Sequence, residues 1–191
     1  MAQQYLDHSK AILTSNRSNF KGGSKGSGII SLFGYQNEYD LREGYPLLTT
    51  KKMATKSMFH ETIWFLRGDT NIKYLEDNNA PIWRPDAFQG NLPGMQKEGI
   101  FPESIEKYSP GWDKAMEEYG QRIKEDPEFA KRWGDAGPIY GKQWRRWEYF
   151  DHEKGTFVEI DQLGKLIKGL KKNPTGKKHI VDSWNPGDTP R

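Results

Sequence analysis

Glu61 is the residue of this sequence whose type and surroundings best suit proton transfer. It lies within Phe-His-Glu-Thr-Ile-Trp-Phe-Leu at residues 59–66, so aromatic and aliphatic side chains surround its carboxylate. A carboxylate in such surroundings is costly unless it is paired, hydrogen-bonded or protonated. A group held in this way is suited to act as a general acid or base near neutral pH. The same residues also fit a helix with Glu61 at the edge of an apolar stripe, pointing to water.

A second group of candidate residues lies at 137–147, with the sequence Gly-Pro-Ile-Tyr-Gly-Lys-Gln-Trp-Arg-Arg-Trp. Tyr140 and Gln143 beside a glycine turn could hydrogen-bond a heterocycle, and neighbouring aromatic side chains could stack on it. Trp83 is flanked by prolines and offers another aromatic surface in a stiff loop. A buried strand after a turn is the alternative interpretation of residues 137–147.

Residues 15–28 form a glycine-rich loop that also contains Lys21 and Lys25. Such a loop can cradle a phosphate group, because small residues leave the backbone N–H groups accessible. The spacing is not that of a Walker A motif, and a flexible solvated loop fits the sequence as well.

The composition excludes several classes of site. There is no cysteine, which rules out disulfides, thiolate metal sites and cysteine nucleophilic catalysis within these 191 residues. The four histidines show no metal-ligand spacing, and we expect no metal site. Charged residues make up 29% with a net charge of +3, too balanced for a protein that coats DNA. Without a long apolar run or a signal-like start, we expect a soluble, cytoplasmic protein with no membrane partner.

These candidate residues need a scaffold, and the apolar periodicity predicts one. We expect helices at residues 3–13, around Glu61 up to a stop at Gly68, and at 72–76, 112–124, 127–134 and 161–171. We expect strands at residues 29–41 and 179–184. The sequence therefore predicts an α+β domain in which both strands join one mixed sheet and the helix around Glu61 is buried against it. The composition of residues 86–135 predicts an inserted helical subdomain that is polar and modestly packed, with a loop at 90–109.

A series of short motifs, taken in order, resembles thymidylate synthases. They are Ser-Leu-Phe-Gly at 31–34, Pro-Leu-Leu-Thr-Thr-Lys at 46–51, His-Glu at 60–61, Trp-Phe-Leu at 64–66, Gly-Asp-Thr-Asn at 68–71, Ile-Trp at 82–83, Gly-Pro-Ile-Tyr-Gly at 137–141, Gln-Trp-Arg at 143–145, Asp-Gln at 161–162 and Ser-Trp-Asn-Pro at 183–186. The resemblance covers nearly the whole chain. It implies that residues 1–191 are the N-terminal portion of an incomplete thymidylate synthase-like α+β domain, with 86–135 as a small helical insert. It also implies a homodimer that methylates dUMP to dTMP with 5,10-methylenetetrahydrofolate as donor of the carbon unit and of the hydride.

The resemblance implies roles for residues that match the family's motifs. Glu61 would hold the water network that moves protons at the pyrimidine carbonyl and at the folate, and Tyr140 would belong to that network. Trp83 would pack against the folate, and Lys51 would lie near the folate's glutamate tail.

Several positions depart from the family's pattern at the phosphate and folate sites. An early phosphate-binding arginine corresponds to Ser24, with Lys25 adjacent, and a folate-contacting histidine corresponds to Ala54. An arginine pair that reaches the partner subunit's phosphate corresponds to Lys177 and Lys178. Lysine attracts phosphate as a point charge without a bidentate fork, so we expect looser binding. Two solvated lysines near the end of a helix are the alternative.

The family's nucleophile is absent from these residues. It is a cysteine in a Pro-Cys-His motif shortly after the Trp-Asn-Pro turn, and the sequence reaches Arg191 without that motif. The resemblance therefore predicts an incomplete, inactive copy of thymidylate synthase. One alternative is a pyrimidine-nucleotide hydroxymethylase of the same fold, which adds water instead of hydride. Another is a non-catalytic paralogue that binds a nucleotide or a partner subunit.

Overall fold

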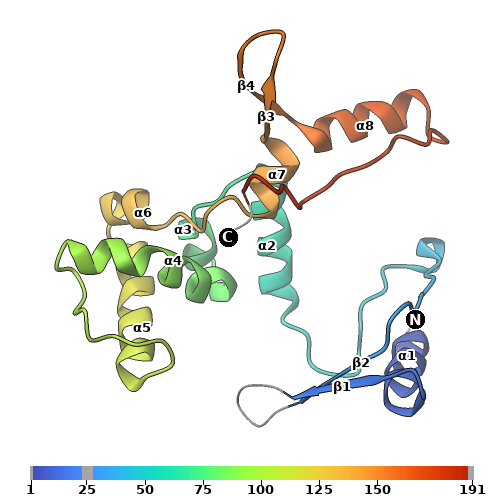
Figure 1. Ribbon diagram of the computed structural model, residues 1–191, viewed down its shortest axis with the longest axis horizontal. Coiled ribbons are helices and arrows are strands. Elements are labelled where there is room, and N and C mark those ends of the chain that lie inside the picture. Colours follow the sequence, from blue (N-terminus) through green and yellow to red (C-terminus); the bar gives the residue numbers. More distant parts are fainter. Residues whose placement is uncertain (1, 23–27, 189–191) are drawn as a thin grey trace. The chain divides into compact units, whose positions relative to one another are not determined.

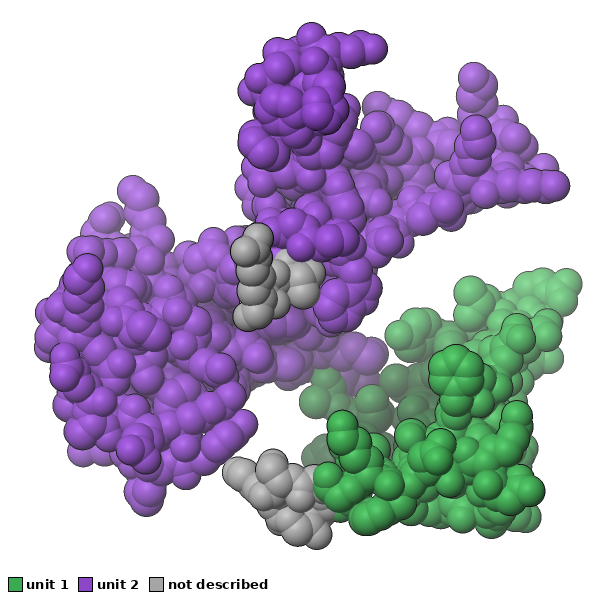
Figure 2. Space-filling model, viewed as in Figure 1, with its two compact units in different colours: residues 1–54 green, residues 55–191 purple. Residues whose placement is uncertain are grey.

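The computed structural model describes residues 2–22 and 28–188. The chain forms two compact units, residues 1–54 and residues 55–191, which are coloured separately in Figure 2. The elements of each unit are labelled in Figure 1. Within the described residues, no helix combines the length and the apolar character needed to cross a bilayer.

The first unit contains a helix and a short hairpin. Helix α1 (Ala2–Thr14) confirms the helix expected at 3–13. Strands β1 (Asn19–Gly22) and β2 (Gly28–Ser31) pair antiparallel, and a 3-10 turn follows at Leu41–Glu43. The strand expected at 29–41 is therefore wrong beyond residue 31. Pairing ends at Asn19↔Ser31, where β1 begins, so the following residues have no partner strand in the described part of the unit.

The second unit begins with α2 (Thr55–Arg67), the helix expected around Glu61. It ends where predicted, because Gly68 adopts a positive φ of 70° that glycine tolerates without strain. The buried Trp64 anchors the helix, and its indole Nε1 donates to the carbonyl oxygen of Asn71 at 2.9 Å.

Residues 71–136 form a helical lobe (Figure 1), with α3 (Lys73–Asp77), a 3-10 turn (Pro81–Trp83), α4 (Arg84–Lys97), α5 (Pro110–Glu125) and α6 (Pro127–Trp133). Helices α3, α5 and α6 were expected, and Asp126 caps α6 by accepting from the Phe129 N–H at 3.0 Å. The loop expected at 90–109 is wrong in its first part, since α4 continues to Lys97 with Pro93 inside it. Burial of Leu92 and Met95 on the inner face of α4 outweighs the poor helix propensity of its glycines and proline.

The helical lobe is also better packed than expected. The prediction of a polar, modestly packed segment at 86–135 is wrong, because this segment supplies most of the core. Its buried hydrophobic residues are Ala87, Phe88, Leu92, Met95, Phe101, Trp112, Ala115, Tyr119, Ile123, Phe129 and Ala130. The many charges misled the prediction, since they lie on the outer faces of amphipathic helices.

Residues 137–188, here called the C-terminal segment, contain α7 (Tyr140–Arg145), the antiparallel hairpin β3 (Trp147–Asp151) and β4 (Thr156–Ile160), and α8 (Gln162–Lys172). Helix α8 was expected, whereas α7 replaces the possible strand at 137–147. The strand expected at 179–184 is wrong. Its backbone is fastened by a side chain instead: the Gln162 amide donates to the Asp182 carbonyl at 2.9 Å and accepts from the Asp182 N–H at 3.0 Å.

The mixed sheet predicted from residues 29–41 and 179–184 is not formed. The described residues contain two small antiparallel sheets, β1–β2 and β3–β4, and the two predicted segments belong to different compact units. The chain nevertheless mixes helices and strands, consistent with an α+β class.

Candidate functional site

Glu61 on α2 accepts a hydrogen bond from Trp83. The indole Nε1 of Trp83 donates to Glu61 Oε1 at 2.7 Å, and both side chains are partly buried. Trp83 ends the 3-10 turn that starts at Pro81, whose ring fixes the backbone there. Among the described residues the Glu61 carboxylate makes no other hydrogen bond, so Oε2 can bind water or a ligand.

Aromatic rings enclose this hydrogen bond on the side of α7. The Tyr140 ring lies edge-to-face with Trp83, with centroids 5.9 Å apart, and with Phe65 at 5.3 Å. Gly141 permits this arrangement, because a Cβ at that position would lie only 3.1 Å from the Cα of Phe65. The close approach of α7 to α2 therefore brings Tyr140 to Glu61's hydrogen-bond partner, Trp83.

A pocket of about 170 Å³ opens beside Trp83 and Tyr140. Its walls combine aromatic and polar side chains and comprise Trp83, Pro138, Ile139, Tyr140, Gln143, Ser183, Trp184, Asn185 and Asp188. Ser183 is held in place by Trp144, whose indole N–H donates to Ser183 Oγ at 2.7 Å. Apolar walls with a few placed polar groups are typical of sites that bind small heterocycles.

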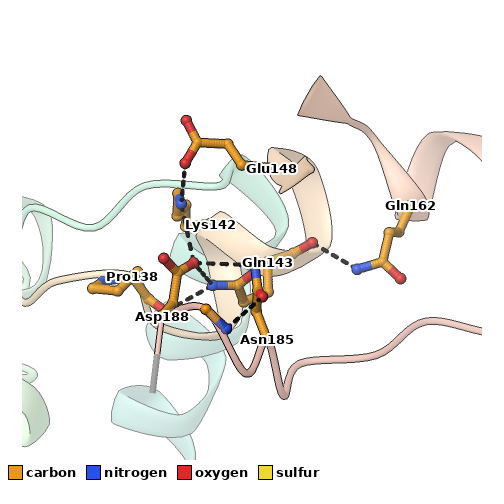
Figure 3. Close-up of polar contacts among 8 residues, drawn as sticks. Pro138, Lys142, Gln143, Glu148, Gln162, Asn185 and Asp188 are labelled. Carbon is orange, nitrogen blue, oxygen red and sulfur yellow. Dashed lines mark hydrogen bonds and ion pairs between the residues drawn. The ribbon is translucent and has the colours of Figure 1, made fainter. Parts of the chain in front are cut away.

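A polar network fastens the turn at 185–188 to α7, as Figure 3 shows. Gln143 Nε2 donates to Asp188 Oδ2 at 2.7 Å and to the Pro138 carbonyl at 3.1 Å. Lys142 Nζ lies 3.1 Å from both Asp188 Oδ2 and Glu148 Oε2. One carboxylate thus joins two consecutive residues of α7 to the far end of the described chain.

The network shifts the pKa values of Asp188 and Lys142. The hydrogen bond from Gln143 lowers the pKa of Asp188; partial burial opposes this shift and Lys142 adds to it. Burial lowers the pKa of Lys142, but the hydrogen bonds to Glu148 and Asp188 outweigh it and leave that pKa raised. Asp188 is therefore an anion and Lys142 a cation at neutral pH.

Gln143 is buried and its Oε1 atom has no hydrogen-bond partner among the described residues. The two acceptors bonded to Nε2, Asp188 and the Pro138 carbonyl, fix the orientation of the amide. An unsatisfied buried acceptor costs about 1–3 kcal/mol. At the wall of a pocket, such an atom marks a place where a donor group could bind.

Lys177 and Lys178 line a separate groove of about 700 Å³ along α8. This groove shares no lining residue with the pocket beside Trp83.

Residues 3–191 match the profile of the thymidylate synthase family. The chain belongs to the thymidylate synthase family. It is 43% identical over 191 residues to the thymidylate synthase of Mesoplasma florum. The aligned residues cover 97% of this chain and 56% of that protein. It is 40% identical over 195 residues to the thymidylate synthases of Listeria monocytogenes serotype 4b and Listeria innocua, covering 98% of this chain and 60% of each relative. The chain thus spans a little more than half the length of these relatives.

The structure brings together only some of the residues predicted from the resemblance to thymidylate synthases. Glu61, Trp83 and Tyr140 form one cluster at the pocket, whereas Lys177 and Lys178 lie in the α8 groove. The remaining predicted positions belong to the first unit: Lys51 and Ala54 are exposed there, and Ser24 and Lys25 lie outside the described residues.

Lys142 and Asp188 are the site residues that sequence reasoning missed. Residues 185–188 were identified only as a turn, and Asp188 meets Gln143 across 45 positions of sequence. No local pattern in this thymidylate synthase-like sequence reports a contact at that separation.

Proposed function

We propose that this chain is the N-terminal part of a thymidylate synthase, which methylates dUMP to dTMP and takes both the carbon unit and the hydride from 5,10-methylenetetrahydrofolate. The observation that carries the proposal is the hydrogen bond from Trp83 to Glu61, beside a pocket that Tyr140 also lines. The family match over residues 3–191 and the named relatives support it.

Glu61 and Tyr140 handle protons in this proposal. Trp83 holds one oxygen of Glu61, so the carboxylate keeps a fixed orientation and presents its other oxygen to a water molecule near the pyrimidine carbonyl. A fixed donor or acceptor within hydrogen-bond reach is what general acid–base catalysis requires. Tyr140 adds a hydroxyl at the pocket wall, and the Trp83 ring offers the folate an apolar surface.

The lysines bind the anionic ends of the two substrates. Lys177 and Lys178, with Lys25, attract the nucleotide phosphate, and Lys51 lies near the glutamate tail of the folate. In the complete enzyme, a cytoplasmic homodimer, the Lys177–Lys178 loop serves the partner subunit's nucleotide. Residues 86–135 are the helical insert of its domain.

These 191 residues alone are inactive in this proposal. The reaction needs a thiolate to add to the pyrimidine ring, and the sequence has no cysteine. Lys177 and Lys178, where the resemblance places an arginine pair, favour a second candidate, a non-catalytic paralogue that binds a nucleotide or a partner subunit.

Tritium release from dUMP labelled at C5 tests the proposal. The 191-residue chain should give background release with 5,10-methylenetetrahydrofolate. A chimera should turn over if the part of the Mesoplasma florum relative that this chain does not match is appended to it. Glu61→Gln in that chimera should lower kcat about 10²–10⁴-fold, the usual contribution of a general acid or base.

Glu118→Gln, on an exposed position of α5, is the matched control and should leave turnover unchanged. A folded chimera without turnover would favour the non-catalytic paralogue. Equal turnover of the Glu61→Gln and Glu118→Gln chimeras would remove Glu61 from the mechanism.

A further inference from the structure

Helix α7 is too short to fix its own position. It contains only the 6 residues from Tyr140 to Arg145, which is less than two helical turns. A helix of this length is not stable in isolation. Its N-cap residue, Ile139, supplies no side-chain hydrogen bond to the first turn. The position of α7 is therefore set by its contacts with other parts of the chain.

Tyr140 is the first residue of α7, and ring contacts hold its side chain. The ring lies against Phe65 and Trp83, and the residue remains 41% exposed. In the part of the chain that the structure describes, the Tyr140 hydroxyl makes no hydrogen bond. Edge-to-face pairs tolerate centroid separations of about 4.5–7 Å, so they leave the ring some freedom. The place of the hydroxyl at the pocket wall therefore follows the backbone of α7.

One oxygen atom of Asp188 accepts three hydrogen bonds, two of them from α7 (Figure 3). Asp188 Oδ2 lies 2.7 Å from Gln143 Nε2 and 3.1 Å from Lys142 Nζ. The third donor is Asn185 Nδ2 at 3.3 Å, within the same turn. Hydrogen bonds to a charged acceptor are roughly twice as strong as those between neutral groups. Asp188 therefore ties α7 to the turn at 185–188 more firmly than a neutral side chain would.

Gln143 carries this restraint to both sides of Tyr140. Its side chain is buried, and the Nε2 atom that donates to Asp188 also donates to the Pro138 carbonyl at 3.1 Å. Pro138 precedes Tyr140 in the chain and Gln143 follows it. The amide thus holds the backbone on both sides of Tyr140, and Asp188 holds the amide. A change at Asp188 should therefore move Tyr140 through Gln143.

We infer that Asp188 is a positioning residue for Tyr140. Through Gln143 and Lys142 it holds α7, so that the Tyr140 hydroxyl lies at the pocket wall. The inference adds to the proposed function a residue that controls proton handling without exchanging a proton itself, and its effect on turnover rests on that proposed function. Its effect on the placement of Tyr140 does not, because that effect follows from the contacts of α7 alone.

Asp151 supplies a matched control in the same C-terminal segment. It ends β3 and accepts from the backbone N–H groups of Glu153 and Lys154 at 3.0 and 3.1 Å. Its Oδ2 also pairs with Lys154 Nζ at 3.0 Å. Within the described residues, Asp151 makes no hydrogen bond to α7. Asp151→Asn and Asp188→Asn therefore remove the same charge from a paired carboxylate, and only the second acts on α7.

Fluorine NMR of the 191-residue chain, labelled with 3-fluorotyrosine, measures the placement of Tyr140. Tyr140→Phe identifies its resonance, which is sensitive to the neighbouring Trp83 ring. Asp188→Asn should shift this resonance, because α7 loses its charged anchor. Asp151→Asn should leave the resonance in place. Far-ultraviolet circular dichroism establishes that each variant is folded.

Lys142→Met is a second, milder variant that decides the question if Asp188→Asn does not fold. It removes one donor to Asp188 and leaves the bond from Gln143, so it should shift the Tyr140 resonance in the same direction by a smaller amount. An unchanged Tyr140 resonance in the folded variants would overturn the inference. Equal shifts from Asp188→Asn and Asp151→Asn would overturn it as well, because they would show only a general effect of lost charge.

Turnover of the chimera with the Mesoplasma florum segment tests the effect on the proposed reaction. Asp188→Asn should lower kcat about tenfold and change the KM for dUMP less than about twofold, because a displaced proton-transfer group slows the chemical step without weakening substrate binding. Asp151→Asn should change neither constant. A raised KM with unchanged kcat in Asp188→Asn would contradict the positioning role. A parent chimera without turnover would count against the proposed function, whereas the NMR result would still decide whether Asp188 places Tyr140.

Discussion

The helical lobe and the C-terminal segment of the second unit are stabilised in different ways. Apart from Trp64 on α2, all the buried hydrophobic residues that the structure describes lie in the lobe, between residues 71 and 136. In the C-terminal segment, large apolar side chains such as Phe157 and Trp184 remain 69% and 74% exposed. Single polar side chains, Gln143 and Gln162, fasten that segment instead. The comparison shows that the lobe depends on buried apolar packing, whereas the C-terminal segment depends on ring contacts of α7 and on a few hydrogen bonds.

The lobe also buries a charged side chain, Glu76, and both of its carboxylate oxygens have a hydrogen-bond partner. Glu76 is buried and accepts from Arg84 Nε and Nη2, both at 2.7 Å. The hydrogen bond with Glu76 raises the pKa of Arg84 despite its burial, and Glu117 reinforces the shift from the surface. A buried pair of this kind is costly to break, because loss of Arg84 would leave the buried Glu76 carboxylate without its partner.

Among the substitutions that compare the two regions, we expect the largest loss of stability from a change at Phe88, in the helical lobe. This fully buried side chain packs against Phe101, Trp112 and Tyr119 at ring-centroid distances of 5.6, 4.8 and 5.3 Å. Phe88→Ala should cost about 3–5 kcal/mol of unfolding free energy, the usual range for a buried phenylalanine. Urea unfolding followed by circular dichroism measures the change.

Phe157→Ala in the C-terminal segment is the control for that measurement. Its side chain is largely exposed on β4 and contacts Phe150, so the loss should be below about 1 kcal/mol. Equal losses for both substitutions would contradict the contrast between a packed lobe and a loosely packed segment.

A smaller effect is expected at the buried ion pair. Glu76→Gln removes a charge-assisted hydrogen bond to Arg84 and should cost about 1.5–3 kcal/mol. Glu117→Gln removes the exposed partner of the same arginine, at 2.6 Å, and should cost less than about 1 kcal/mol. Urea unfolding of both variants compares them. A larger loss from Glu117→Gln would show that the surface contact, not the buried one, holds Arg84.

Apart from the two control substitutions, Phe157→Ala and Glu117→Gln, the smallest loss of stability should come from the polar network of the C-terminal segment. Gln143→Glu replaces a donor by a second carboxylate next to Asp188 and should cost about 1–2 kcal/mol. The double variant Q143E/D188N exchanges donor and acceptor and should recover part of that loss, which a double-mutant cycle in urea quantifies. Additive losses would mean that the two side chains do not interact.

The pH dependence of stability gives the same contact an independent test. Folding lowers the pKa of Asp188, so its contribution is present above the ordinary carboxyl pKa and is lost as pH falls through the lower folded value. Between about pH 5 and about pH 3, the parent chain should therefore lose more stability than Asp188→Asn. If the melting temperatures of the parent chain and of Asp188→Asn fell by the same amount over this pH range, the role given to Asp188 would be contradicted.

Sequence reasoning succeeded where the information was local. Helices α1, α2, α5, α6 and α8 followed from apolar periodicity and end signals such as Gly68 and Asp126. It failed where a partner decides the outcome. Helix α4 forms despite Pro93 because its inner face is buried, and residues 179–184 form no strand because Gln162, not a neighbouring strand, satisfies Asp182.

The sequence by itself determined the family, the helix around Glu61 and the absence of a cysteine nucleophile in these residues. These properties reside in residue types and short spacings. Only the tertiary structure decided that Trp83 donates to Glu61 and that Asp188 joins Gln143, across 22 and 45 positions. Contacts between distant residues depend on how helices approach one another, as Gly141 allows α7 to approach α2, and no local pattern encodes that geometry.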